Sequence, residues 1–194
     1  MSKITRKKFR EYYQPSKIML GVFSDPKANR FNIITLCFTT TCSYNPPMIA
    51  ISIEDRNYSY GLAEHSKEIV LAIPGKSLAD ETMQCGFYSG RDVDKFSICS
   101  FTKLNLPNVE IPGIAEAIAN IEVKVINRIK TGDHITLFCE VLGYHLNDSK
   151  VEKNLVSFGP NTLGYDLLVK KGMHRIGVLN GEDENYIDFF KDLM

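Results

Sequence analysis

One stretch of this 194-residue chain decides its fold class: residues 121–141, which read IEVKVINRIKTGDHITLFCEV. On both sides of its centre, apolar residues alternate with polar ones: Val123, Val125, Ile129, Ile135, Leu137, Cys139 and Val141. Strands that bury one face and expose the other show this period of two. The centre, residues 130–133, has the chemistry of a tight turn, with Gly132 followed by Asp133. The stretch therefore predicts a long antiparallel hairpin.

The rest of the chain carries shorter patterns. Apolar and β-branched runs predict strands at residues 18–23, 32–38, 48–53, 69–73, 118–129 and 134–144, the last two being the hairpin. Residues 25–29 have turn composition. Helical patterns occupy residues 58–67, 76–84 and 183–193, and carboxylates precede the last of these, where a helix dipole favours them. We expect a mainly β fold, a closed or nearly closed antiparallel barrel with helices packed around it.

Composition limits the size class and the partners. A chain of 194 residues, 44% of them hydrophobic, is long enough for one well-buried core, so we expect a single domain over residues 1–194 with its core at 16–170. The 23 basic and 23 acidic residues balance, which argues against nucleic acid or an anionic membrane as a partner. No segment approaches the length needed to span a bilayer. A small molecule or another protein is the expected partner.

The cysteines and histidines argue against metal and disulfide scaffolds. The cysteines are odd in number and lack CxxC pairs: Cys37, Cys42, Cys85, Cys99 and Cys139. This pattern predicts a reducing cytoplasm as the compartment. The histidines have neither HxxxH nor HExxH spacing, so we expect no metal site.

The connector at residues 85–96, CGFYSGRDVDKF, has the composition of an anion-binding loop. It combines two glycines, the hydroxyl groups of Tyr88 and Ser89, and the cations Arg91 and Lys95. Backbone N–H groups and two cations can converge there on a phosphate. Gly, Ser and Asp also form ordinary turns, and that alternative stays open.

Residues 32–47, NIITLCFTTTCSYNPP, predict a strand that runs into a hydroxyl-rich loop. Pro46 and Pro47 restrict the backbone and favour an extended course for the preceding loop. Such a loop can present backbone groups to a flat heteroaromatic ring. The alternative is an edge strand, because threonine is common in strands. Cys37 and Cys42 flank the hydroxyl-rich part.

His134 is the histidine with a plausible site position. It opens the second hairpin strand at the rim of the expected barrel, where its ring can contact a bound ligand. The alternative is a turn followed by an ordinary strand start. Other catalytic signatures are missing, since the chain has no GxSxG elbow, no GxxxxGK[ST] loop and no strand-placed GxGxxG.

Taken in order, these motifs resemble the flavin reductase-like, flavoredoxin-type family of FMN-binding split barrels, over residues 18–165. The resemblance rests on the following segments: Asn32 and Thr35, Pro46-Pro47, Ser52-Ile53, residues 56–59, residues 85–96 and residues 132–134. It implies a Greek-key split β-barrel with flanking α-helices, a homodimer, and FMN bound near the subunit interface. It also implies electron transfer from a reduced nicotinamide, NADH or NADPH, or from a redox protein.

The resemblance also assigns roles by position. Asn32 stands where the family has a flavin-contacting Asn, Phe38 where it often has Trp, and Ser59 where it often has Thr. Lys95 with Arg91 is expected to hold the phosphate, and His134 to position the nicotinamide or the flavin. Tyr165, or Leu167, is the expected aromatic or apolar cover of the flavin. The full set of expected cofactor-binding residues is Asn32, Thr35, Phe38, Thr39, Thr40, Thr41, Cys42, Ser43, Ser59, Ser89, Arg91, Lys95, Phe96, His134 and Tyr165.

The expected function is that of a flavoprotein oxidoreductase which moves electrons from NAD(P)H through FMN to an acceptor. Two alternatives stay open. One is an electron carrier of the flavoredoxin type without its own nicotinamide site, and the other is a non-enzymatic barrel that has lost its cofactor.

Overall fold

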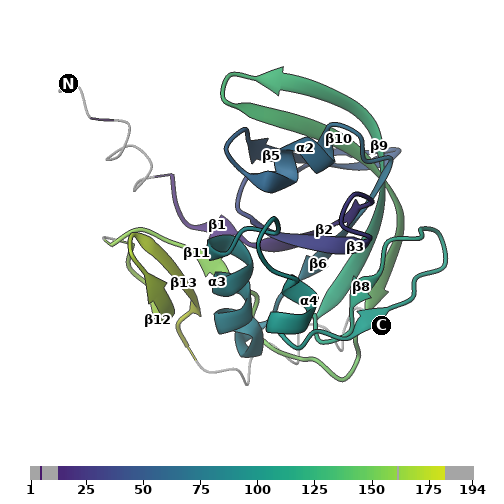
Figure 1. The fold of residues 1–194 in the computed structure, drawn as a ribbon. Coiled ribbons are helices and arrows are strands. Elements are labelled where there is room, and N and C mark those ends of the chain that lie inside the picture. Colours follow the sequence, from purple (N-terminus) through teal and green to yellow (C-terminus); the bar gives the residue numbers. More distant parts are fainter. Residues whose placement is uncertain (1–4, 6–12, 161, 182–194) are drawn as a thin grey trace.

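A seven-stranded sheet forms the body of the molecule in the computed structural model, which describes residue 5, residues 13–160 and residues 162–181 (Figure 1). Its strand order is β3-β2-β6-β9-β10-β5-β4, and every hydrogen-bonded pair in it is antiparallel. The strands are β2 (Met19–Asp25), β3 (Arg30–Leu36), β4 (Thr39–Tyr44), β5 (Pro47–Glu54), β6 (Glu68–Ile73), β9 (Ala119–Thr131) and β10 (His134–Leu146).

The sheet curls almost into a closed barrel. Its two edge strands, β3 and β4, follow one another in the chain and are joined by Cys37 and Phe38 alone. So short a connection spans at most about 11 Å between the flanking Cα atoms. The end of β3 and the start of β4 therefore lie close together, while no hydrogen-bonded ladder joins these two edge strands. The mainly β, Greek-key split-barrel prediction is confirmed.

The long hairpin and the other strand predictions are confirmed as well. β9 pairs with β10 along its length, and His134 faces Thr131 across the turn at Gly132 and Asp133. Gly132 has a φ of +65°, in the left-handed region that favours glycine. The register shifts once between Phe138 and Cys139 and again between Val141 and Gly143, which are β-bulges that bend the hairpin.

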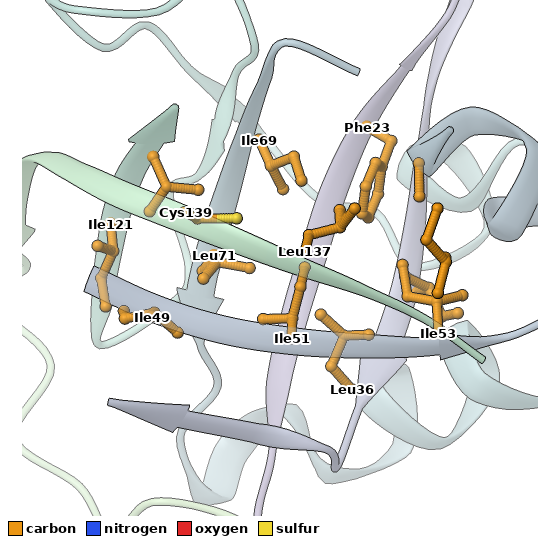
Figure 2. Packing of buried hydrophobic residues seen from close by; sticks show 14 of the residues in the cluster. Phe23, Leu36, Ile49, Ile51, Ile53, Ile69, Leu71, Ile121, Leu137 and Cys139 are labelled. Atoms are coloured by element: carbon orange, nitrogen blue, oxygen red, sulfur yellow. The ribbon is translucent and has the colours of Figure 1, made fainter. Parts of the chain in front are cut away.

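The barrel interior is filled by alternate residues of its strands. Figure 2 shows Ile51, Ile53, Leu71 and Leu137 converging on the enclosed space together with Phe23, and each of them is at most 1% exposed. Their positions follow the period of two that the sequence predicts. Burial of this apolar surface is the main term that stabilises the fold.

The outer face of β2, β3 and β6 carries a second apolar cluster. It includes Leu20, Val22, Ile33 and Val70 from these strands, and α3 (Ala79–Phe87) and α4 (Lys95–Ile98) contribute residues that cover it. The covering residues are Cys85, Phe96 and Cys99. This outer layer, rather than the barrel interior, positions the candidate site.

The helix predictions are confirmed in part. The segment predicted at residues 58–67 is α2 (Tyr58–Ala63), and the one at 76–84 is the short 3-10 helix η1 (Lys76–Leu78) followed by α3. The connector at 85–96 was expected to be a loop, but α3 continues through Phe87 and α4 begins at Lys95. The Asp94 carboxylate caps α4 by accepting from the Phe96 backbone N–H at 3.0 Å. The helix predicted at 183–193 lies outside the described residues.

A small second sheet was not predicted. It has the order β1-β11-β13-β12, with β1 (Ser16–Lys17), β11 (Val156–Ser157), β12 (Tyr165–Lys171) and β13 (His174–Leu179). Figure 1 shows it beside α3. A further pair joins β7 (Lys103–Leu104) to β8 (Gly113–Ile114). β12 lacks a clean alternation of apolar and polar residues, which explains why periodicity did not reveal it.

Candidate functional site

Two segments far apart in the sequence enclose a polar cavity of about 120 Å³. One is residues 56–59, at the start of α2, and the other is residues 85–90, at the end of α3. Ile34 and Lys95 complete the lining. Figure 1 shows the loop between α3 and α4 extending from these helices toward the side on which α2 lies.

Lys95 places a cation in the wall of this cavity. Its side chain is only 3% exposed, and its Nζ donates to the carbonyl oxygens of Ile33 and Cys85, both at 2.6 Å. Burial lowers the pKa of the Lys95 ammonium below its usual value. An ammonium has three N–H donors, and the described residues provide acceptors for two of them. The third is therefore available to an anionic ligand in the cavity.

Asn32 and Ser59 form a buried polar pair beside the cavity. The Asn32 Nδ2 donates to the Ser59 Oγ at 2.8 Å, and the two side chains are 2% and 3% exposed. Among the residues described, no donor reaches the Asn32 Oδ1. A buried acceptor without a donor is costly, and the Gly90 backbone packs directly against this one. The Lys95 charge and the hydroxyl groups of Ser59 and Ser89 in the lining fit the phosphate of FMN.

Gly90 permits this arrangement because it has no side chain. A Cβ at Gly90 would lie 1.9 Å from the Asn32 Oδ1, inside any allowed contact. We therefore expect Gly90→Ala to destabilise the fold by about 1–3 kcal/mol, since the loop or Asn32 must move. The matched control is Gly61→Ala on α2, where an added Cβ meets nothing within 4 Å. Denaturant unfolding should show the control to be neutral or slightly more stable, and equal stabilities for the two variants would contradict the close packing.

A second layer supports the rim of the cavity. The Arg91 guanidinium carbon lies 5.6 Å from the centre of the Tyr58 ring, and the Tyr58 hydroxyl donates to the buried Asp25 carboxylate at 2.8 Å. That hydrogen bond raises the pKa of Tyr58. Arg30 donates to the Gly90 carbonyl. Arg91 itself does not line the cavity but lies over Tyr58, which does.

Two other expected residues are close to the cavity. Ser89 lines it, and its hydroxyl oxygen accepts from the Arg91 backbone N–H at 3.2 Å. Thr35 lies behind it, where its hydroxyl donates to the Thr82 carbonyl at 2.6 Å. Gly86 approaches Thr35 closely, since a Cβ there would come within 3.2 Å of the Thr35 Cβ. Thr35 thus attaches α3 to β3 and supports the lining without belonging to it.

His134 and Phe38 form an aromatic pair outside the cavity lining. Their ring centres are 5.4 Å apart with an interplanar angle of 21°. The His134 Nδ1 lies 2.7 Å from the Asp133 carboxylate, and the Asp133 carbonyl accepts from the Asp55 backbone N–H at 2.9 Å. This turn is therefore hydrogen-bonded to the segment that enters the cavity wall at Arg56. Phe38 is 51% exposed, so the pair presents an aromatic surface to solvent.

The structure does not bring the remaining expected residues to the cavity. Of the two alternatives for the hydroxyl-rich segment, a loop and an edge strand, the structure shows the edge strand β4, paired with β5. Strand pairing satisfies its backbone, and its side chains are mostly solvent-exposed. The expected cofactor residues affected are Thr39, Thr40, Thr41, Cys42 and Ser43.

Phe96 and Tyr165 are also elsewhere. Phe96 is 4% exposed within the cluster beneath α3 and α4, where burial of its ring stabilises the fold. Tyr165 stacks on Phe158 at 5.8 Å between ring centres, in the small sheet. Leu167, the alternative cover residue, is 50% exposed on β12.

An aromatic pair at the cavity was missed by the sequence reasoning. Phe87 and Tyr88 line the cavity and meet edge to face with ring centres 5.5 Å apart. Lys171, at the end of β12, lies with its Nζ 3.4 Å from the Phe87 ring centre and 4.8 Å from that of Tyr88. Two adjacent aromatics in a glycine-rich connector are a usable signal, but nothing in the sequence indicates that Lys171 reaches them.

The described part of the chain has no grouping typical of a metal site and no membrane-spanning helix. No three of its His, Cys, Asp and Glu side chains are grouped so that they could hold a metal ion. None of the helices there is long and apolar enough to cross a membrane.

Comparisons with known proteins agree with the geometry. Residues 15–190 match the model of the flavin reductase like domain. An uncharacterized protein of Archaeoglobus fulgidus is 29% identical over 160 residues, which cover 78% of this chain and 89% of that protein.

Two solved structures share the fold. Flavoredoxin from Methanosarcina acetivorans superposes with a TM-score of 0.76 at 16% identity, covering 100% of this chain and 99% of that one. An FMN-binding protein from Thermus thermophilus with bound 1-cyclohex-2-enone superposes with a TM-score of 0.69 at 20% identity, covering 82% and 90%. Because the family match spans most of the chain, this protein belongs to the flavin reductase-like domain family.

Proposed function

We propose that this protein is an FMN-binding flavoprotein oxidoreductase which moves electrons from NADH or NADPH through bound FMN to an acceptor. The observation that carries the proposal is the buried Lys95 ammonium, held by two carbonyl oxygens in the wall of a polar cavity. A buried cation with an unused donor is the group that recognises a phosphate. Membership of the flavin reductase-like family supports a flavin as its carrier.

The residues around the cavity would make different contacts with FMN. Lys95 would hold the phosphate, with Ser59 and Ser89 as hydroxyl partners. When bound, FMN would supply the capacity to accept a hydride and release electrons, which the protein's own side chains lack. The cavity of about 120 Å³ is smaller than the roughly 300–1,000 Å³ that encloses a whole small ligand. The ring would therefore lie outside it, against further protein surface.

Anaerobic addition of NADH or NADPH to FMN-loaded protein is expected to bleach the flavin absorbance. His134→Ala is expected to slow this reduction severalfold or more while leaving the flavin content unchanged. Asp133 orients the His134 ring, and a lost positioning contact raises the barrier by about 1 kcal/mol or more. Stopped-flow absorbance measures the rate, and His174→Ala, at an exposed histidine on β13, is the matched control.

The same experiment separates the alternatives. Unchanged reduction in a His134→Ala variant that retains its flavin would remove His134 from the mechanism. Bound FMN without any reduction by either nicotinamide would favour the electron carrier, which receives electrons from a redox protein. Purified protein that is colourless and whose melting temperature does not rise with added FMN would favour the barrel that has lost its cofactor.

The functional unit is expected to be a homodimer that binds about one FMN per chain. Apolar side chains are exposed along the long hairpin: Ile126 (51%), Ile129 (48%), Leu142 (38%) and Tyr144 (65%). An apolar surface of this kind is a candidate subunit interface, and twofold association is the commonest oligomeric state. Light scattering should give twice the 21.9 kDa chain mass. A monomer mass at micromolar concentration with flavin bound would contradict this expectation.

A further inference from the structure

Two of the five cysteines meet in the outer layer of the fold. Cys85 belongs to α3 and Cys99 is the C-terminal cap of α4, and their Sγ atoms are 3.7 Å apart. The side chains are 1% and 6% exposed, within the cluster that α3 and α4 form on the barrel. A disulfide requires the sulfur atoms to approach to about 2.05 Å, which is a short movement from this separation.

Both cysteines are hydrogen-bonded to Lys95, the cation of the candidate site, through their backbone groups. The Cys85 carbonyl is one of the two acceptors of the Lys95 Nζ, at 2.6 Å. The Cys99 backbone N–H donates to the Lys95 carbonyl at 3.2 Å. Residues 86–98, which lie between the two cysteines, include the glycine-rich part of the cavity wall and Lys95 itself. A bond between the sulfurs would therefore close a loop around the phosphate-binding segment.

The two thiols of the pair have shifted pKa values. The hydrogen bond between the two thiols lowers the pKa of Cys99 and raises that of Cys85. Burial raises the pKa of Cys139 to about 12, so that thiol is unreactive. Cys42 is exposed on the edge strand β4. Cys85 lines the cavity and the adjoining Cys99 is 6% exposed, so a small oxidant has only a short path to the pair.

We propose that Cys85 and Cys99 form a reversible disulfide, and that this bond raises the affinity of the loop between them for FMN. With hydrogen peroxide as the oxidant, the Cys99 thiolate attacks one oxygen, breaks the O–O bond and becomes a sulfenic acid as water leaves. The Cys85 sulfur then attacks the Cys99 sulfur and releases a second water. The two sulfurs lose two electrons in total to the peroxide, and both thiol protons end in water. A dithiol or excess thiol reverses the bond by exchange.

The direction of the effect follows from loop entropy. A disulfide removes conformational freedom from the loop it closes, and a loop held in its binding conformation costs less to order when the ligand arrives. FMN should therefore bind about 3- to 10-fold more tightly to the oxidised protein than to the reduced protein. This part of the inference rests on the proposed FMN function, whereas formation of the disulfide does not.

The first test is chemical and needs no cofactor. Full-length protein with Cys42→Ser, which removes the exposed thiol, is treated with hydrogen peroxide and then alkylated. We expect the intact mass measured before alkylation to fall by two hydrogens, peptide mapping after alkylation to link Cys85 to Cys99, and dithiothreitol to reverse both changes. The further variants Cys99→Ser and Cys85→Ser should lose the linked peptide. Unlinked Cys85 and Cys99 after oxidation would overturn the proposal even if neither variant folds.

The second test measures the effect of the disulfide on stability and on FMN affinity. The melting temperature of the apo protein should rise by about 3–10 °C on oxidation, and the FMN dissociation constant from fluorescence titration should fall. The Cys99→Ser variant should show neither change. A disulfide that forms without altering FMN affinity would overturn the coupling. If neither redox form binds FMN, the proposed cofactor function fails, while the mass and melting data still decide whether the disulfide exists.

Discussion

Replacing Lys95 with methionine is expected to weaken FMN binding by about 10- to 100-fold and riboflavin binding much less. Charge-assisted contacts to phosphate contribute about 1.5–3 kcal/mol, and riboflavin has no phosphate to lose. Methionine keeps an unbranched apolar stem in a site that is 3% exposed, so the packing of α4 is largely retained. Fluorescence titration with both ligands measures the difference.

The control for charge alone is Lys124→Met, at an exposed lysine on β9. It should leave both affinities unchanged. Equal losses of FMN and riboflavin affinity in Lys95→Met would show that Lys95 supports the loop without contacting the phosphate.

The pH dependence gives an independent check on the same residue. The phosphate contact requires the ammonium form, so it is present below the pKa of Lys95 and is lost as the pH rises through it. Burial lowers that pKa, and the loss should therefore begin at a lower pH than for an exposed lysine. The ratio of FMN to riboflavin affinity should fall with rising pH in the unmutated protein and stay flat in Lys95→Met.

The second large effect is expected in the barrel interior. Leu137→Ala should destabilise the protein by about 3 kcal/mol, because Leu137 is fully buried in the barrel interior and its removal leaves a cavity (Figure 2). For a chain of this length the melting temperature should fall by about 6–12 °C. Calorimetry measures it. Leu163→Ala, at a leucine that is 91% exposed, is the matched control and should change stability by less than about 0.5 kcal/mol.

A near-normal melting temperature in Leu137→Ala would mean that the barrel interior can collapse around the missing side chain. It would contradict the close packing between Leu137 and its neighbours on β5 and β6.

Much of the fold could be predicted from the sequence because strand periodicity is local. Val123, Val125, Ile135 and Leu137 alternate with polar residues, and this pattern alone specifies a half-buried hairpin. Gly132 then specifies where the hairpin turns. The family resemblance supplied the split-barrel topology, which the periodicity of separate strands does not determine.

The candidate site could be predicted only in outline. The sequence indicates a segment rich in glycine, hydroxyl groups and cations at residues 85–96, and the cavity wall includes much of it. For residues 39–43 the sequence left both a loop and an edge strand open, because threonine serves equally in either. Pairing with β5 decided between the two. The sequence of a strand does not show which other segment it will pair with.

By itself, the sequence determined most strands of the barrel, the tight turn and the residue types available for an anion, because propensity and periodicity act over a few neighbouring residues. Only the tertiary structure decided that Lys95 is buried against the Ile33 and Cys85 carbonyls, that Asn32 faces Gly90, and that Lys171 reaches the cavity rim. Each of these contacts joins residues brought together by packing of α3, α4 and the small sheet against the barrel. Burial and charge in the site depend on that packing, since the environment of a side chain is set by its neighbours in space.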